Sequence, residues 1–187
     1  MKRTFIAVPV PITEALRNEI EMFKNELYHE KIRWVKSSQM HITLAFLGDT
    51  TENDVSAVIQ ELPAHLNKFE AFIADFKGLG VFPKPSRPRV VWVGAGPGEK
   101  WMELQSSIDR MLKRLDVSYD QKNFHPHLTL GRIKYLRQLN LLEHLLSKYK
   151  SYTFQSVTIS EVHYYESILK PGGASYKLLK NIRLTEI

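Results

Sequence analysis

The chain has 187 residues, of which 43% are hydrophobic and 25% charged, and its formal net charge is +6. Such a length and composition are typical of one globular domain with a sizeable core, and the positive charge favours an anionic partner such as RNA or a nucleotide. The chain contains no cysteine, which excludes disulfides, thiolate metal sites and a cysteine nucleophile.

The first residues are not typical of a secretion signal. Pro9 and Pro11 interrupt a short apolar run, and acidic residues follow it. No stretch reaches the apolar length that a bilayer-spanning helix needs. We therefore expect a cytoplasmic protein without a membrane segment. We also expect it to be a monomer.

The first half of the chain predicts strands and helices in alternation. The apolar run Thr4–Val10 is typical of a buried strand, and Thr13 is placed to cap the helix that follows. That helix carries apolar residues at helical spacing: Leu16, Ile20, Phe23 and Leu27. The further predicted elements are a strand from His41 to Gly48, a helix from Thr51 to about Leu66, and two strands around Phe69–Phe76 and Leu79–Phe82.

A similar order of elements begins again after the basic loop Pro83–Arg89. The predicted elements are a strand Val90–Val93, a helix from Gly98 to Leu115, a strand at His127, a helix from Leu136 to Tyr149, strands Phe154–Ile159 and Val162–Tyr165, a loop Ser167–Ser175 and a strand Tyr176–Leu184. The two series match at an offset of roughly 85 residues. We expect a single domain, 1–187, with an internal repeat of about 1–88 and 89–175 and a C-terminal strand 176–184.

This repeated pattern predicts an α+β fold with two lobes. Each lobe would contain a mainly antiparallel sheet with its helices on the outer face. The two uncovered sheet faces would then enclose a central groove.

Two short motifs, His-Ile-Thr-Leu and His-Leu-Thr-Leu, begin equivalent strands in the two halves. Side chains alternate along a strand, so His41 and Thr43 share one face of the first strand, as His127 and Thr129 do in the second. The opposite faces are expected to be buried and carry Ile42, Leu44 and Phe46 in the first strand and Leu128 and Leu130 in the second.

Two histidines that face each other across a groove are suited to acid–base chemistry. A neutral imidazole accepts a proton and an imidazolium donates one, and both forms are accessible because the ordinary pKa is about 6.5. Displacement at phosphorus needs one group to activate the attacking oxygen and another to protonate the leaving oxygen. The hydroxyls of Thr43 and Thr129 could hold the phosphate oxygens without a metal. The pattern therefore favours phosphodiester cleavage or its reversal.

Other sites are weaker interpretations. His125 and His127 have the spacing of metal ligands, but no carboxylate stands at ligand spacing beside them. The chain lacks the Gly-x-Ser-x-Gly turn of many serine hydrolases and the glycine patterns that bind nucleotide phosphates. Four histidines are expected to be surface or packing residues: His29, His65, His144 and His163.

At these residues the sequence resembles the 2H phosphoesterases, and within them the RNA 2′,3′-cyclic phosphodiesterase branch, which is also labelled 2′-5′ RNA ligase. The resemblance extends over nearly the whole chain because both motifs occur in register with similar flanking residues. The matching segments are Arg3–Ala7, Trp34-Val35, His41–Gly48, Phe82-Pro83, Arg89–Gly94, Phe124–Arg132, Tyr165–Ser167, Gly172-Gly173 and Tyr176.

The resemblance implies hydrolysis of the 2′,3′-cyclic phosphate end of RNA, or of a small cyclic nucleotide, to a 2′-phosphate without a metal or other cofactor. It assigns His41 as the proton donor to the leaving 3′ oxygen and His127 as the proton acceptor from water. It also implies that Thr43, Thr129 and Arg132 bind the phosphate.

The resemblance leaves further contacts and alternatives open. His125, Ser167 and Tyr176 are candidate substrate contacts, and Ala45 stands where relatives often carry a basic residue. We therefore expect the strand of His127 to contribute more to phosphate binding than the strand of His41. Ligation to a 2′-5′ linkage as the relevant direction, and a non-catalytic RNA- or nucleotide-binding module, are the alternatives.

Overall fold

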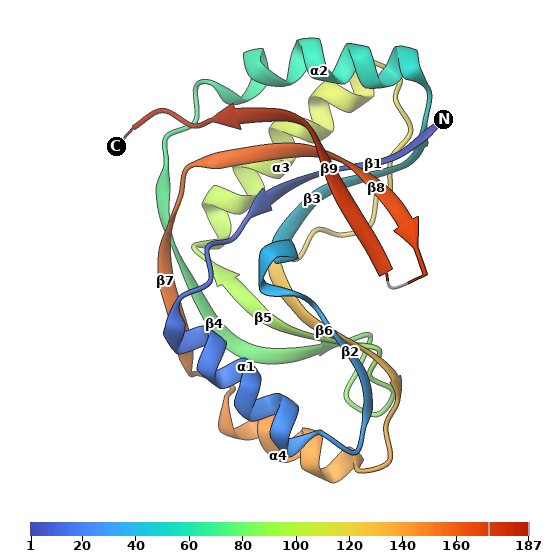
Figure 1. Ribbon diagram of the computed structural model, residues 1–187. Coiled ribbons are helices and arrows are strands. Elements are labelled where there is room, and N and C mark those ends of the chain that lie inside the picture. The colour runs from blue at the N-terminus through green and yellow to red at the C-terminus, as the bar shows by residue number, and fades with distance from the viewer. Residues whose placement is uncertain (172, 187) are drawn as a thin grey trace.

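The computed structural model describes residues 1–171 and 173–186, so Gly172 of the matching C-terminal segment lies outside the described residues. The described chain forms two antiparallel sheets with helices on their outer sides (Figure 1). The elements are β1 (Lys2–Pro9), α1 (Glu14–Glu26), β2 (Lys31–Trp34), the short 3-10 helix η1 (Ser37–Gln39), β3 (His41–Thr50), α2 (Glu52–Leu66), β4 (Phe72–Phe82), β5 (Val90–Gly96), α3 (Gly98–Arg114), β6 (His127–Tyr135), α4 (Leu139–Lys148), β7 (Thr153–Ile159), β8 (Glu161–Lys170) and β9 (Gly173–Arg183).

The predicted α+β class with two antiparallel sheets is confirmed. One sheet has the strand order β3-β1-β8-β9 and the other β2-β6-β5-β4-β7. Helices α2 and α3 pack on the four-stranded sheet, and α1 and α4 pack on the five-stranded sheet. Among the described residues, no helix is long and apolar enough to cross a lipid bilayer.

The two halves of the sequence exchange strands and helices. Strand β4 belongs to the first half but pairs with β5 of the second, and β8 of the second half pairs with β1 of the first. Likewise, helix α1 of the first half packs on β7 of the second, and helix α3 of the second half packs on β3 of the first. The sequence position near residue 88 is therefore not a boundary between the sheets. An internal repeat as the origin of this arrangement stays a prediction.

Local signals account for where the first two helices begin. The Thr13 hydroxyl accepts a hydrogen bond from the Leu16 N–H at 3.3 Å, and the Thr51 hydroxyl accepts one from the Asp54 N–H at 3.1 Å. Each bond satisfies an N–H group that has no partner within its own helix. Both helices start where the sequence predicts.

Two predicted boundaries are wrong. The segment expected to form two strands around Phe69–Phe76 and Leu79–Phe82 is the single strand β4, which continues through an irregularity at Gly78. Gly78 has a φ of +76°, a conformation that glycine adopts without a steric penalty. The expected loop Ser167–Ser175 is mostly paired, because β8 continues to Lys170 and β9 begins at Gly173.

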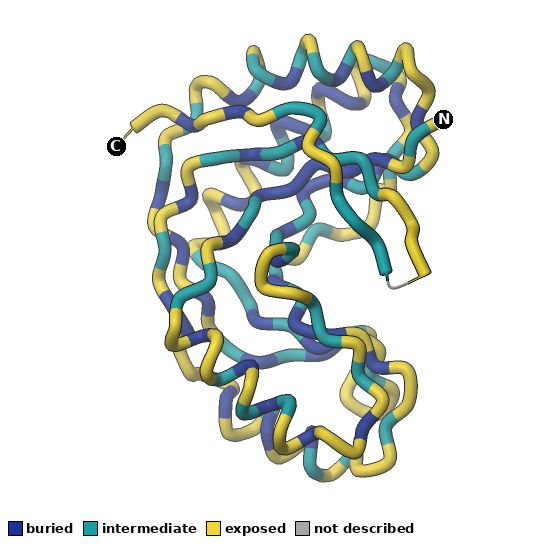
Figure 2. Tube along the Cα trace, in the orientation of Figure 1, coloured by how far each residue is buried: buried dark blue, intermediate teal, exposed yellow. Residues whose placement is uncertain are grey.

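The two sheets share one hydrophobic core. Buried apolar side chains from both sheets and from all four α-helices form a continuous cluster (Figure 2). Since neither lobe has a core of its own, we expect the chain to unfold as one cooperative unit.

Candidate active site

The two motif histidines meet where the sheets approach each other. His41 is the first residue of β3 and His127 the first residue of β6, and these two strands are in contact. A cavity of about 80 Å³ lies between them. Its lining residues are Val35, Gln39, His41, Thr43, His127, Thr129, Arg132 and Tyr176.

An irregularity in each motif strand decides which residues face this cavity. In β3 the pairing with β1 shifts so that Leu44 and Ala45 are both buried, and in β6 the same happens to Leu130 and Gly131. Such a β-bulge reverses the alternation of side chains beyond it. Because of the bulge in β6, Arg132 lies on the face of the strand that lines the cavity.

The bulge in β3 turns Phe46 away from the buried face of the strand, where the sequence predicts it. Phe46 is half-buried and lines a neighbouring hollow together with Thr43. The Arg3 guanidinium lies 5.1 Å from the centre of its ring. The prediction for Phe46 was wrong because strict alternation does not survive a bulge. Ala45, the residue before Phe46, is buried in the core, with 5% of its surface exposed.

Each catalytic candidate is held by a backbone carbonyl two residues before it. His41 Nδ1 lies 2.7 Å from the Gln39 carbonyl oxygen, and His127 Nδ1 lies 2.6 Å from the His125 carbonyl oxygen. A carbonyl can only accept, so each Nδ1 carries the hydrogen. In the neutral ring this leaves Nε2 with a free lone pair that can receive a proton from the cavity.

The surroundings lower the pKa of both imidazoles below the ordinary 6.5. For His41 the largest cause is burial, and the positive charges of Arg132 and His127 add to it. For His127 burial again comes first, followed by His125 and Arg132. In both cases the hydrogen bond to the carbonyl opposes the shift, because it stabilises the imidazolium.

Aromatic rings support both histidines from the side. The Phe5 ring centre lies 5.1 Å from that of His41, and the Tyr176 ring centre 5.4 Å from it. The Phe82 ring centre lies 4.9 Å from that of His127. Sequence reasoning did not assign Phe5 and Phe82 to the site, although both belong to the flanking segments that carry the resemblance. The apolar walls explain why burial is the main cause of the lowered pKa values.

Comparison with known proteins identifies the family of the chain. A family model described as LigT like Phosphoesterase matches residues 6–92 and 95–176. The chain belongs to this LigT-like phosphoesterase family. Two similar proteins are named RNA 2′,3′-cyclic phosphodiesterase. The one from Aeropyrum pernix is 39% identical over 153 residues, which are 81% of this chain and 86% of that protein.

The second relative, from Archaeoglobus fulgidus, is 33% identical over 179 residues, which are 95% of this chain and 98% of that protein. A crystal structure of a Thermus thermophilus protein has the same fold, with a TM-score of 0.81 at 23% identity and 98% of both chains covered. The match therefore extends over both sheets of the LigT-like phosphoesterase.

The remaining predicted site residues of this phosphoesterase lie beside the cavity. His125 lines the hollow that contains Phe46, which has a volume of about 380 Å³ and also reaches Thr43 and His127. Ser167 pairs with Tyr176 in the β8–β9 ladder and is not among the cavity-lining residues described. Within residues 1–171 and 173–186, no three His, Asp or Glu side chains are grouped so that they could hold a metal ion.

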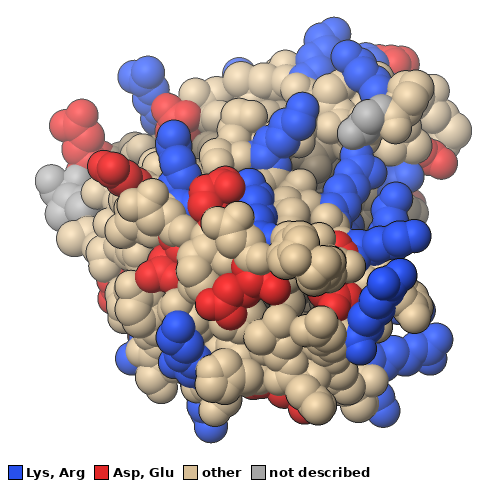
Figure 3. All heavy atoms as spheres, turned by 60° about the horizontal axis from the view of Figure 1, so that its bottom comes forward, with Lys and Arg blue, Asp and Glu red and all other residues tan. Residues whose placement is uncertain are grey.

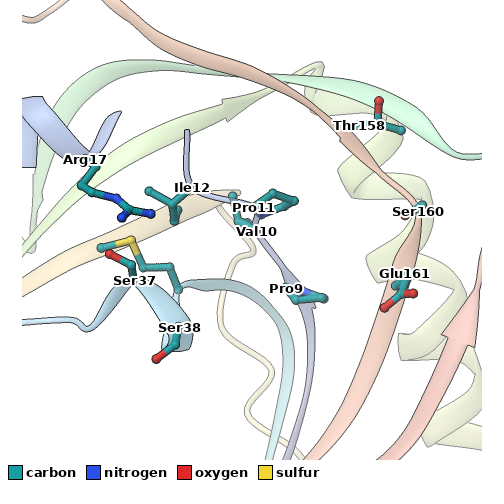
Figure 4. A pocket seen from close by; sticks show the side chains of 11 residues that line it. Pro9, Val10, Pro11, Ile12, Arg17, Ser37, Ser38, Thr158, Ser160 and Glu161 are labelled. Carbon is teal, nitrogen blue, oxygen red and sulfur yellow. The ribbon is translucent and has the colours of Figure 1, made fainter. Parts of the chain in front are cut away.

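A larger hollow of the phosphoesterase, about 610 Å³, lies away from His127. Residues of the β1–α1 connection, of η1 and of the β7–β8 turn line it, and they include Arg17 and Glu161 (Figure 4). Nearby, His163 bonds to the Glu161 carboxylate at 2.8 Å and to the Tyr165 hydroxyl at 2.6 Å. Both of its ring nitrogens thus have side-chain partners, as expected for a packing residue.

Proposed function

We propose that this phosphoesterase hydrolyses the 2′,3′-cyclic phosphate end of RNA to a 2′-phosphate, with the two motif histidines as acid and base. One observation carries the proposal. Two imidazoles, each with Nδ1 held by a carbonyl, share one cavity with two threonine hydroxyls and an arginine. The names of the relatives from Aeropyrum pernix and Archaeoglobus fulgidus support the same substrate class.

In the proposed reaction His127 Nε2 takes a proton from water while the water oxygen attacks phosphorus. The bond from phosphorus to the 3′ oxygen breaks, and His41 Nε2–H donates its proton to that oxygen. The product carries a 2′-phosphate and a free 3′ hydroxyl. The division of roles follows the family resemblance, because the two imidazoles have matching hydrogen bonds.

Three other side chains would hold the phosphate. The hydroxyls of Thr43 and Thr129 can donate to its non-bridging oxygens, and the Arg132 guanidinium can balance the negative charge that increases in the transition state. All three residues line the cavity, which supports their assignment as phosphate donors.

Substrate binding would also prepare the acid. Both imidazoles have a lowered pKa and are mostly neutral in the free protein at neutral pH. A phosphodiester anion between them favours the protonated form and raises the pKa. The acid would therefore gain its proton as the anion enters.

The test uses an oligoribonucleotide that ends in a 2′,3′-cyclic phosphate, with a chelator present. We expect full activity in wild type and a loss of about 10²- to 10⁴-fold in both His41→Ala and His127→Ala. His144→Ala, on the exposed side of α4, is the matched control. A wild-type protein without turnover would contradict the proposal, and an activity abolished by the chelator would favour a metal mechanism.

The same assay separates the alternatives. Binding of the cyclic end without turnover would favour a non-catalytic module. Addition of a second RNA with a free 5′ hydroxyl would reveal 2′-5′ ligation if that direction were preferred. The monomeric state and the cytoplasmic location stay predictions.

A further inference from the structure

A second hollow adjoins the catalytic cavity on the side of Arg132. It has a volume of about 640 Å³ and lies between β2, η1 and the β8–β9 hairpin. Its lining residues are Arg33, Trp34, Val35, Lys36, Gln39, Arg132, Lys170, Gly173, Ala174, Ser175 and Tyr176. In Figure 3, Lys and Arg side chains gather along the right-hand edge of the molecule, where Figure 1 places β2 and the hairpin. We call this hollow the basic arm.

The charges of the basic arm are all positive. Four of its lining residues are Lys or Arg, and none is Asp or Glu. Within the described chain, none of the ion pairs involves Lys36, Arg132 or Lys170. Like charges gathered in one hollow repel each other, and an anion placed among them removes that cost. The charge of the basic arm is therefore complementary to an anion.

The other hollows around the cavity lack this property. The hollow that contains Phe46 is lined by Asp120 as well as Lys122, and the hollow of Figure 4 is lined by Glu161 as well as Arg17. The hollow between His41 and Tyr165 has no charged lysine, arginine, aspartate or glutamate in its lining. Among these surfaces, the basic arm is the one whose charge suits a polyanion.

The basic arm is continuous with the site of reaction. It shares Val35, Gln39, Arg132 and Tyr176 with the catalytic cavity. At their boundary the Gln39 side-chain amide donates to the Ala174 carbonyl at 2.8 Å, which joins η1 to the hairpin. An anion in the basic arm would thus lie next to a phosphate in the cavity, at a boundary fixed by a hydrogen bond.

We propose that the basic arm binds the phosphate on the 5′ side of the terminal nucleoside, so that the enzyme selects an RNA end over a free nucleoside 2′,3′-cyclic phosphate. This inference rests on the proposed function. A cyclic phosphate occurs at the 3′ end of a chain, so the next phosphate along the RNA is attached to the 5′ oxygen of the same ribose. Lys36 and Lys170 are then specificity-determining residues that do not touch the reacting atoms.

The sharpest test compares two substrates that differ by one phosphate. Adenosine 2′,3′-cyclic phosphate carries the reacting group alone, and its 5′-phosphorylated form adds the upstream phosphate without a second base. We expect wild type to prefer the 5′-phosphorylated form. Lys36→Ala and Lys170→Ala each lower kcat/KM for that form by about fivefold and leave kcat/KM for the unphosphorylated form unchanged.

Salt dependence gives an independent reading of the same contacts. With a short RNA substrate, the slope of log kcat/KM against log salt concentration should become shallower by about 0.7 for each phosphate contact removed. Lys100→Ala is the matched control because Lys100 is an exposed lysine on α3 that does not line the basic arm or the catalytic cavity. It should change neither the preference nor the slope.

The outcomes distinguish this inference from the proposed function. Equal losses on both substrates, or no loss with either lysine variant, would overturn the inference while hydrolysis itself stands. If wild type hydrolysed neither these two substrates nor an oligoribonucleotide with a 2′,3′-cyclic phosphate end, the proposed function would fail. The basic arm would then be tested by the binding of an oligoribonucleotide with a 2′,3′-cyclic phosphate end, measured by fluorescence anisotropy. An affinity that is unchanged in the Lys36→Ala/Lys170→Ala double variant would refute it.

Discussion

Arg132 has two separable effects in the proposed mechanism, and the variant Arg132→Met tests both. In that mechanism the guanidinium would bind the phosphate, and in the structure its charge is among the causes that lower the pKa of His41 and of His127. Its removal should therefore weaken transition-state binding and at the same time raise both pKa values. A residue with a purely structural role would not produce this pair of effects.

The magnitude of the first effect follows from the lost contact. A hydrogen bond to a charged group contributes about 1.5–3 kcal/mol, which corresponds to a fall in kcat/KM of about 10- to 100-fold. The second effect has a defined sign. Wild-type kcat/KM should be highest below pH 6.5, because both pKa values in the free enzyme are lowered from that value. In Arg132→Met this optimum should move to higher pH.

The assay measures kcat/KM on a 2′,3′-cyclic phosphate end across pH, and NMR follows the imidazole resonances of the two histidines without substrate. Lys134→Met is the matched control, since Lys134 is an exposed cation on the same strand and lies outside the cavity lining. The two effects assigned to Arg132 are refuted if Arg132→Met loses no more activity than this control, or if the histidine pKa values stay constant or fall.

Three further predictions concern the supports of the site. Gly80→Ala would place a Cβ 2.3 Å from the Trp92 ring. We therefore expect the unfolding free energy, measured by urea denaturation, to fall by about 1–3 kcal/mol, and we expect a lower kcat. The buried Glu30 carboxylate accepts hydrogen bonds from two backbone N–H groups just before α4. Glu30→Ala should therefore lower the unfolding free energy by about 1–3 kcal/mol in the same measurement, and Glu30→Gln should lower it less. Inorganic phosphate should raise the pKa of His41 and His127 in an NMR titration, because the anion stabilises each imidazolium, and an unchanged pKa would contradict the proposed charging of the acid.

Much of the secondary structure was predictable because its causes are local. Thr13 and Thr51 mark the helix starts through hydrogen bonds that span three residues. The apolar residues of α3 recur at helical spacing, and the helix occupies almost the predicted range. The motif strands also begin where the sequence places them, at His41 and His127.

The pairing of the strands within the sheets could not be predicted from such local signals. Strand β4 lies at the end of the first half of the sequence. Its two edges nevertheless pair with β5 and β7, which belong to the second half. Which strands pair depends on contacts between segments far apart in the chain, and a local pattern does not encode them. The orientation of Phe46 was missed for a related reason, because the bulge in β3 exists relative to its partner β1.

Under the proposed function, the two bulges give a nearly symmetric site an asymmetry that would orient the substrate. The histidines, their carbonyl partners and the threonines are equivalent in the two strands, so these groups alone would accept a phosphodiester in either direction. The residue that each bulge turns outward is different: Phe46 beyond the first and Arg132 beyond the second. The cation lies on the side of the basic arm, and the apolar ring lies on the side of a hollow that also contains an acidic residue. The charge difference between the two sides would therefore fix the direction of the RNA chain, and with it which histidine faces the leaving oxygen.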